Sequence, residues 1–474
     1  MLEKYKLKDL FQNRYVPLYL AAFVFYYLVW AIYGYHIQPD TENYLQMGRG
    51  IFEQFTFGFK GEGGLYYPVA FRMPLAPFFL GLFYFVTKDA HLTYWFYSLF
   101  QVLLAPIIPC IAFYFGSQIN KKVAYGAYVF IILHANVIAC FIMILADTLF
   151  AVLSGLTFVS LWIALQKQER RNFLLTGLVT GVACMTRPIM KLYFLAILLL
   201  SSAHFSAWKP LLRCLALFLL GFGLILSPWI IRNFLHYKAF VLETNQGLNM
   251  LWTNWHLVKI KETDPLEIRL IKERIVNYGS SPMNILTYRG WQHWLEHDYE
   301  ISKNLQKIAM KAYLENPIEV FNNWRENFLR VTYSQRQYYY MYENILSRPF
   351  YLKVRNLNII HPKDFDRKVF HLYCEVHRLI NWCYVFIAPI GLLLLLLRER
   401  KMGIFIAVNI LYFTGLTAFA AGYDRYRLNI EIFYAVLVMY PIICFASIIK
   451  NEIGKLIVKR DRGNEIKHNN SHTE

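Results

Sequence analysis

Residues 208–231 read WKPLLRCLALFLLGFGLILSPWII. About 20 predominantly apolar residues in a row form a helix long enough to cross the hydrocarbon core of a bilayer. The charged residues of this stretch, Lys209 and Arg213, both lie near its start. The stretch therefore predicts a transmembrane helix, and similar apolar stretches recur along the chain.

The composition of the whole chain agrees with this prediction. Of its 474 residues, 57% are hydrophobic and 17% are charged, with a mean hydropathy of +0.32, whereas soluble domains are about 45–50% apolar and about 25% charged. A disordered chain, a collagen-like repeat and a disulfide-rich secreted scaffold are excluded. Six of the seven cysteines lie in apolar segments and only Cys374 lies in the long polar region, so no disulfide framework is implied.

Ten apolar segments are suitable for crossing a membrane. They are residues 16–35, 91–117, 123–138, 140–165, 172–186, 188–203, 208–231, 378–397, 402–421 and 427–449. The basic start MLEKYKLKDLFQNR leads into the first of them without a small-residue cleavage site, which predicts an uncleaved span. The expected fold class is all-α, a polytopic membrane bundle of about 10 spans.

A further apolar stretch, residues 74–87, decides the orientation of every later span. If it does not cross, five basic clusters fall on the cytoplasmic side with the N-terminus, as the positive-inside rule requires; if it crosses, all five move outside. The clusters are Lys121–Lys122, Lys167 with Arg170–Arg171, Lys209 with Arg213, Arg398 with Arg400–Lys401, and the tail from Lys450. We therefore expect 74–87 to be a helix on the outer surface, with both chain ends inside.

The net charge of +18 is explained by the same short basic patches, which are topology signals, so we do not expect nucleic acid as a partner. A second surface helix is expected at 41–54, where Tyr44, Leu45, Ile51 and Phe52 form an apolar stripe. The short segments 172–186 and 188–203 predict a tilted hairpin.

The expected organisation has four parts. These are an N-terminal transmembrane core at 1–231 that includes the first outer loop 36–90, an extracytoplasmic helical region at 232–376, C-terminal spans at 377–449 and a polar cytoplasmic tail at 450–474. Within the polar region, helical patterns at 299–315 and 318–330 are separated by Asn316-Pro317.

Several charged residues depart from the positive-inside trend. Five arginines lie at the outer ends of spans or surface helices: Arg72, Arg187, Arg232, Arg425 and Arg427. Asp40, Glu42 and Asp147 lie on the same face. Arginine forks match phosphate oxygens, and carboxylates serve as general bases or as ligands of hard cations. Taken singly, Asp40 also fits a helix N-cap and Asp147 a helix-packing contact; together with the arginines they indicate a site for a lipid phosphate.

The order of six short motifs resembles the GT-C superfamily of integral-membrane glycosyltransferases, closest to the branches of protein O-mannosyltransferases and of lipid A aminoarabinose transferases. The motifs are PDTENYLQMGRGIFE from Pro39, AFRMPLAPFFLGLFYF from Ala70, ILADTLF from Ile144, MTRPIM from Met185, SPWIIRNFLHYKAFVLETNQGLNMLW from Ser227 and GYDRYRLNIE from Gly422. This chain departs from the family pattern at Met73, Asp147 and Gln246, where the family has Pro, Glu and Gly.

The resemblance implies a hexosyl or pentosyl transferase that uses a polyprenyl-phosphate-linked sugar and acts with inversion on a glycan, lipid or protein acceptor. Asp40 is the expected base, with Asp147 as a second catalytic residue. Expected substrate-binding residues are Glu42, Tyr44, Arg72, Arg187, Arg232, Asn233, Asn245, Arg425 and Arg427. A divalent metal cation, held by Asp147 and Glu42, is the one cofactor considered.

The expected location is the plasma (inner) membrane, with membrane lipids around the spans and the site facing the periplasm or exterior. The alternative is a transporter or flippase for a lipid-linked sugar. Such proteins place charges near the bilayer midplane on broken helices, often with repeat symmetry. Here the charges line one face and the sequence has no visible repeat, which favours the transferase.

Overall fold

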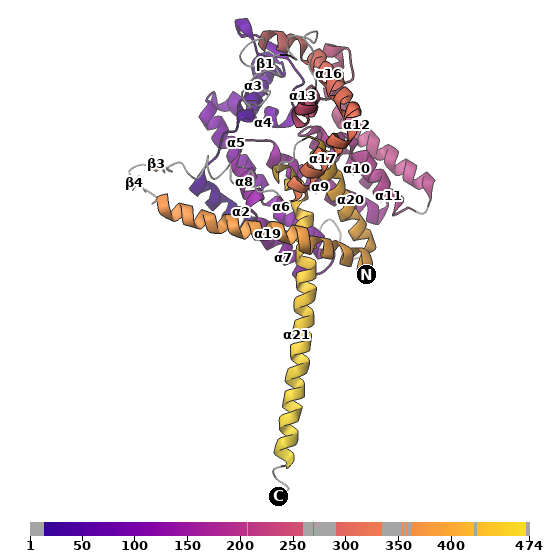
Figure 1. The fold of residues 1–474 in the computed structure, drawn as a ribbon. Coiled ribbons are helices and arrows are strands. Elements are labelled where there is room, and N and C mark those ends of the chain that lie inside the picture. Colours follow the sequence, from indigo (N-terminus) through magenta and orange to yellow (C-terminus); the bar gives the residue numbers. More distant parts are fainter. Residues whose placement is uncertain are drawn as a thin grey trace.

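In the computed structural model, the structure describes residues 14–205, 207–258, 291–333, 363–420 and 424–470, with short pieces at 269, 353–354 and 357–358. These residues are mainly helical, as predicted (Figure 1). Two small antiparallel sheets pair β1 (Gly58–Lys60) with β2 (Tyr66–Pro68) and β3 (Lys353–Val354) with β4 (Leu357–Asn358).

The helices of the first half follow one another with short connections. They are α2 (Tyr15–Tyr33), α3 (Pro39–Gln54), α4 (Leu75–Thr87), α5 (Ala90–Leu104), α6 (Ile107–Ser117), α7 (Lys121–Ile132), α8 (Ala135–Ile142), α9 (Asp147–Lys167), α10 (Arg170–Cys184), η2 (Pro188–Leu192), α11 (Tyr193–Ser202) and α12 (Trp208–Tyr237). The later elements are α13 (Gln246–Thr253), η3 (Trp255–Leu257), α16 (Trp291–Glu315), α17 (Pro317–Tyr333), α19 (Lys363–Arg398), α20 (Arg400–Ala420), η5 (Asp424–Ile430) and α21 (Glu431–Asn470).

Among the described residues, seven helices are long and apolar enough to cross a membrane, or up to eight if the bent pair α7–α8 is one span. The seven are Tyr15–Tyr33, Ala90–Ser117, Asp147–Lys167, Trp208–Tyr237, Leu379–Arg398, Arg400–Phe419 and Arg425–Glu452. The protein is thus a multi-pass membrane protein. The expected ten spans exceed the upper number, eight, by the two segments of the tilted hairpin. In the structure, the segments 172–186 and 188–203 correspond to the short helices α10 and η2–α11.

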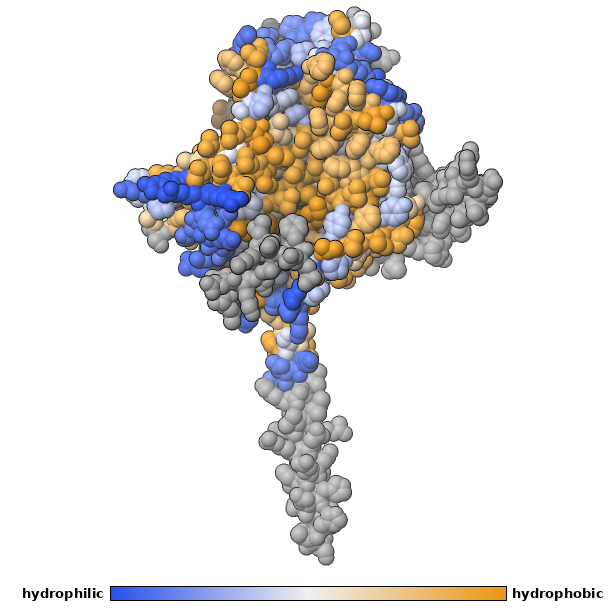
Figure 2. Space-filling view, turned by 180° about the vertical axis from the view of Figure 1, so that it is seen from behind, coloured by the Kyte–Doolittle hydropathy of each residue, from blue (hydrophilic) through white to orange (hydrophobic). Residues whose placement is uncertain are grey.

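Hydrophobic residues form a broad belt across the middle of the face seen in Figure 2, with hydrophilic residues gathered above it. The elements at the upper end of the body in Figure 1 are α3, β1 and α16, whereas α21 leaves the lower end as one long helix. A belt of apolar surface between polar ends is what a membrane-embedded body requires.

Helix α4 has 13 residues and is therefore about 20 Å long, short of the roughly 30 Å of a bilayer core. It packs closely on α3 through two glycines. A Cβ added to Gly48 would lie 2.1 Å from the Pro77 carbonyl oxygen, and one added to Gly81 would lie 2.2 Å from the Gly48 oxygen. The apolar stripe expected to face lipid on α3 partly faces α4 instead, because Tyr44 and Leu45 are buried and the Phe52 ring contacts Phe78.

Cysteine labelling tests whether α4 stays on the outer surface. A single cysteine at Lys88, after the C-terminus of α4, is expected to react with a membrane-impermeant maleimide from outside, and one at Lys121 from inside only. The reason is the distribution of basic loops together with the length of α4. Labelling of position 88 from the cytoplasmic side would reverse the orientation of all later spans.

The segment 143–146 interrupts the predicted spans 123–138 and 140–165. It is not helical, and its backbone pairs with His36, whose N–H donates to the Ile142 oxygen at 2.8 Å and whose oxygen accepts from the Ile144 N–H at 2.9 Å. Gln101 donates to the Met143 oxygen at 2.8 Å and Tyr97 to the Leu145 oxygen at 3.1 Å. Non-helical backbone inside a membrane protein requires such partners, and here it places Asp147 at the start of α9.

The described part of the polar region 232–376 holds α13, α16, α17 and the β3–β4 pair, and α16 lies beside the first outer loop. The predicted break at Asn316-Pro317 is confirmed between α16 and α17. Asp298 on α16 accepts hydrogen bonds from Tyr237 at 2.9 Å, from the Thr244 hydroxyl at 2.8 Å and from the Ala70 N–H at 3.3 Å. This one carboxylate therefore joins α16 to the end of α12, the 243–245 turn and the first outer loop.

Candidate active site

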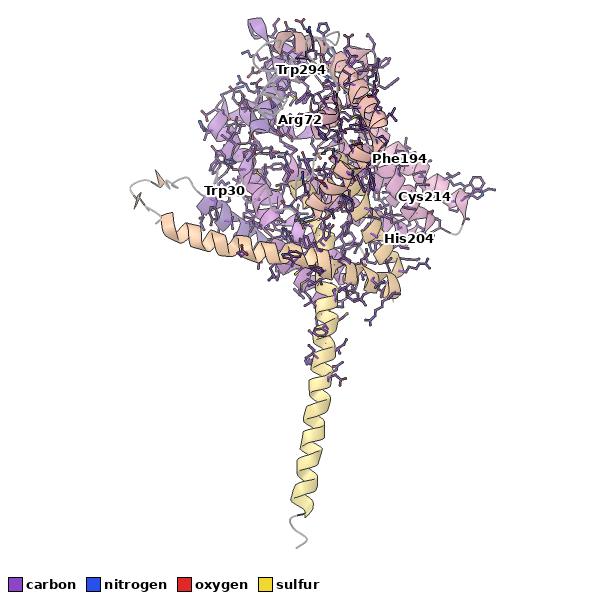
Figure 3. All side chains as sticks on the ribbon, viewed as in Figure 1. Trp30, Arg72, Phe194, His204, Cys214 and Trp294 are labelled. Atoms are coloured by element: carbon purple, nitrogen blue, oxygen red, sulfur yellow. The ribbon has the colours of Figure 1, made fainter. Side chains whose placement is uncertain are left out.

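A cavity of about 510 Å³ lies between the first outer loop, the start of α9, the α10–η2 junction, the turn before α13 and η5. Its ionisable lining residues include four cations and three acids: Arg72, Arg187, Lys191, Arg425, Asp40, Asp147 and Glu243. Figure 3 shows Arg72 in the upper part of the body, below Trp294 and above His204 and Cys214. The excess of cations suits an anionic ligand.

Asp40 lies in the first turn of α3. The N-cap is Gln38, whose backbone N–H donates to the Thr41 hydroxyl at 2.9 Å in a capping box, so Asp40 is not needed as a cap. Its carboxylate instead accepts a hydrogen bond from Arg72 at 2.8 Å.

Positive charge keeps Asp40 ionised. Burial alone would raise the pKa of the Asp40 carboxyl. The charge of Arg72, followed by those of Arg425 and Arg187, outweighs burial and lowers that pKa below its ordinary value. Asp40 is therefore a carboxylate at neutral pH in the ligand-free protein.

Asp147 is the first residue of α9 and only 4% exposed. One of its oxygens accepts from Arg187 at 2.7 Å, and the other, Oδ2, is buried without a hydrogen-bond partner among the described residues. Arg187 itself lies over the Tyr426 ring, 5.0 Å from its centroid. A buried carboxylate oxygen without a hydrogen-bond partner is rare in proteins, and a bound ion or a hydroxyl group would satisfy it.

The structure brings together part of the predicted site. Asp40, Tyr44, Arg72, Asp147, Arg187, Asn245 and Arg425 all line the cavity. Arg425 Nη2 approaches the Tyr426 hydroxyl at 3.3 Å. These residues come from six separate stretches of the chain, one from each of the six motifs.

The remaining predicted residues are not among those lining the cavity. Arg232 donates to the backbone oxygens of Val69 at 2.9 Å and Phe57 at 2.7 Å, and Asn233 donates to the Val241 oxygen at 2.9 Å. These two residues hold the first outer loop and the 241–245 turn against α12.

Arg427 and Glu42 have protein partners as well. Arg427 is completely buried and binds Glu431 at 2.7 Å and the Val331 oxygen at 3.0 Å. Glu42 accepts from Tyr94 at 3.1 Å and from Gln46 at 3.2 Å. Positive-inside counting assigned these residues to one face of the membrane, but it could not predict which way their side chains point.

Of the two predicted cation ligands, Asp147 lines the cavity and Glu42 is not among its lining residues. Among the residues that the structure describes, no three His, Cys, Asp or Glu side chains are grouped as a metal site. The free Oδ2 of Asp147 is the atom there that fits a cation or a hydroxyl.

The lining residues that the sequence analysis did not propose for the site include Lys191, Glu243, Gln246 and Tyr426. Lys191 Nζ donates to Gln246 Oε1 at 3.0 Å. Glu243 lies two residues before Asn245 in the quoted motif from Ser227, and Tyr426 separates two arginines. The sequence signal that could have identified them is that each lies within a few residues of a predicted site residue.

No family model and no curated protein matches this chain. Solved structures do. The crystal structure of ArnT from Cupriavidus metallidurans bound to undecaprenyl phosphate has 12% identity and a TM-score of 0.40, over 90% of this chain and 78% of that one. The apo form of the same ArnT gives 12% identity and a TM-score of 0.38 over the same shares.

A further match is the cryo-EM structure of the arabinosyltransferase EmbB from Mycobacterium smegmatis. It has 13% identity and a TM-score of 0.37, over 89% of this chain and 42% of that one. At TM-scores of 0.37 to 0.40 these matches carry no argument about this chain. The residues of the chain itself decide what its site can do.

Proposed function

We propose that this protein is a membrane glycosyltransferase that moves a sugar from a polyprenyl-phosphate-linked donor to an acceptor on the outer face of the membrane. The observation that carries the proposal is the pair of carboxylate–arginine contacts, Asp40–Arg72 and Asp147–Arg187, in one cavity with Arg425. Arginine side chains bind a phosphate through charged hydrogen bonds, and a carboxylate can act as the general base.

The reaction needs a proton acceptor on one side of the sugar and cations on the other. Asp40 takes the proton of the acceptor hydroxyl while that oxygen forms a bond to the anomeric carbon. The bond between this carbon and the phosphate oxygen breaks, and the polyprenyl phosphate leaves with the electron pair. A single displacement of this kind inverts the anomeric centre.

Arg72 has two roles in this scheme. In the free protein it binds Asp40 at 2.8 Å and makes that carboxylate a weak base. A donor phosphate attracts the Arg72 guanidinium, which weakens the hold on Asp40 and increases its basicity when the substrate is present. Arg187 and Arg425 stabilise the negative charge that grows on the leaving phosphate.

Arg187→Ala tests the phosphate site. We expect donor turnover to fall about ten- to a hundredfold, since a charged hydrogen bond contributes about 1.5–3 kcal/mol and 1.4 kcal/mol is tenfold. Lysine is expected to restore part of the loss because it keeps the charge but lacks the planar fork. The measurement is the release of free polyprenyl phosphate by purified protein with acceptor present.

The matched control is Arg170→Ala, because Arg170 is exposed at the start of α10 and does not line the cavity. Thermal unfolding of both variants separates loss of binding from loss of folding. Equal turnover in the two variants would place the phosphate elsewhere. A wild-type protein that moves the lipid-linked sugar across a bilayer without releasing polyprenyl phosphate would be a transporter instead.

A further inference from the structure

The cavity also carries polar groups that the phosphate scheme does not use. Lys191, Glu243, Asn245 and Gln246 line it, and we call them the Glu243 cluster. Lys191 donates to Gln246 at 3.0 Å, and Asn245 is the N-cap residue of α13. The cluster combines a cation, a carboxyl and two amides, and none of these four side chains takes part in the two carboxylate–arginine contacts.

Glu243 differs from the other carboxyls in the cavity. Asp40 and Asp147 each bind an arginine, but Glu243 has no hydrogen bond or ion pair with any residue in the described part of the chain. The charged side chains that act on its carboxyl group are those of Lys191 and Arg72. A carboxyl that lines a cavity without a partner is a group left for a ligand.

The backbone around Glu243 is held firmly. The Thr244 N–H donates to the Ala70 oxygen at 2.8 Å, and the Thr244 hydroxyl donates to Asp298 at 2.8 Å. The next residue, Asn245, begins α13. The position of Glu243 is therefore fixed before a ligand arrives, which limits the entropy lost on binding.

Electrostatics make Glu243 unsuitable for the phosphate. Burial raises the pKa of this carboxyl, while Lys191 and Arg72 act to lower it, and the net shift is upward. An ionised carboxylate repels a phosphate, and a protonated one offers it a single donor. Both forms, however, accept hydrogen bonds from hydroxyl groups.

We propose that the Glu243 cluster binds the hydroxyl groups of the transferred sugar, with Glu243 as the residue that distinguishes the sugar-bearing donor from the bare lipid phosphate. Lys191 and the amides of Asn245 and Gln246 supply donors to sugar oxygens, and Glu243 accepts from sugar hydroxyls. This assignment rests on the proposed transferase function. It assigns the arginines and the Glu243 cluster to the two chemically different parts of one donor.

The test compares two lipids on purified protein in nanodiscs by native mass spectrometry. One probe is undecaprenyl phosphate, and the other is the fraction of polyprenyl-phosphate sugars extracted from the cells that make the protein. The wild type is expected to prefer a sugar-bearing lipid by about tenfold or more. Glu243→Gln is expected to remove most of this preference while the affinity for undecaprenyl phosphate changes by less than about twofold.

Glu319→Gln is the matched control, because Glu319 is exposed on α17 and does not line the cavity, so both affinities should stay as in the wild type. An unchanged preference in Glu243→Gln, an equal loss for both lipids, or a wild type without preference would each overturn the sugar-binding role and leave the transferase proposal standing. A wild type that binds neither lipid would overturn the transferase proposal itself.

Discussion

Asp40→Asn is expected to reduce sugar transfer by about 10²–10⁴-fold while the protein remains folded, because loss of a general base removes that much rate. Asparagine keeps the size of the side chain and an oxygen that can accept from Arg72, which now lies 2.8 Å from Asp40. It cannot take a proton from the acceptor. The N-terminus of α3 does not depend on the substitution, since Gln38 and Thr41 form the capping box.

The measurement is turnover of a polyprenyl-phosphate sugar by the purified variant, with donor affinity measured separately. Affinity is expected to change far less than turnover, because the arginines remain. Asn43→Ala is a useful comparison at a neighbouring, half-buried position of α3 that does not line the cavity. Near-normal turnover in Asp40→Asn would assign the base to another group, and Asp147 with its unpaired Oδ2 would be the next to test.

The pH dependence of the reaction rate provides a second, independent test of Asp40 as the general base. The profile of kcat/KM reports the free enzyme, whose Asp40 pKa is lowered mainly by Arg72 against the effect of burial. Its acid limb should therefore lie below about pH 3.9, the ordinary pKa of an aspartate. If Arg72 moves to the donor phosphate, the acid limb of kcat, which reports the complex, should lie at higher pH. Coincident limbs would contradict this movement of Arg72.

The sequence predicted which regions meet at the site, and the reason is topological. Spans of fixed length with alternating direction bring their outer ends to one level, so Asp40, Asp147, Arg187 and Arg425 could be assigned to one face. The cavity lined by all four agrees with that prediction. The break at 143–146 was not predicted, because its hydrogen bonds come from distant residues.

The sequence could not predict the direction in which individual side chains point. Arg187 and Arg232 both follow the outer end of an apolar segment, yet one faces the cavity and the other binds the carbonyl oxygens of residues 57 and 69. Only the packing of the first outer loop against α12 decides between them. Glu243 was missed for the same reason, since a single acid in a polar loop has no pattern of its own.

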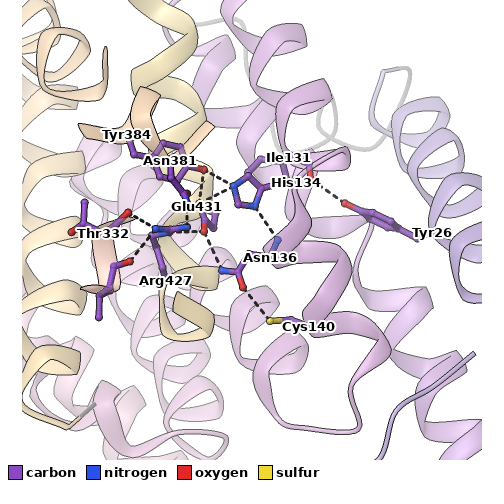
Figure 4. A network of polar contacts seen from close by, with 11 residues as sticks. Tyr26, Ile131, His134, Asn136, Cys140, Thr332, Asn381, Tyr384, Arg427 and Glu431 are labelled. Atoms are coloured by element: carbon purple, nitrogen blue, oxygen red, sulfur yellow. Dashed lines mark hydrogen bonds and ion pairs between the residues drawn. The ribbon is translucent and has the colours of Figure 1, made fainter. Parts of the chain in front are cut away.

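Arg427 belongs to a fully buried polar network (Figure 4). It donates to Glu431 at 2.7 Å, to Asn381 at 3.2 Å and to the backbone oxygens of residues 331 and 332. Glu431 also accepts from Tyr384 at 2.6 Å and from Asn136 at 3.1 Å. One ion pair therefore joins η5 and α21 to α8, α17 and α19.

Arg427→Met is expected to lower the free energy of unfolding by about 3–5 kcal/mol, because it leaves the Glu431 carboxylate buried without its cation. The matched control is Arg330→Met, which breaks a pair of the same i, i+4 spacing, Glu326 to Arg330 at 3.2 Å, whose side chains are 56% and 51% exposed. Exposed pairs of this kind contribute about 0.3–0.5 kcal/mol. The measurement is unfolding in detergent followed by tryptophan fluorescence.

The double variant Arg427→Met, Glu431→Leu is expected to recover much of the stability, because replacing both partners of a buried ion pair by apolar groups is often neutral. Recovery would identify the uncompensated charge, rather than lost packing, as the cause of the instability. It would also separate Arg427 from the cavity arginines, whose variants should lose donor binding with little loss of stability. Equal unfolding curves for Arg427→Met and Arg330→Met would contradict a structural role for this network.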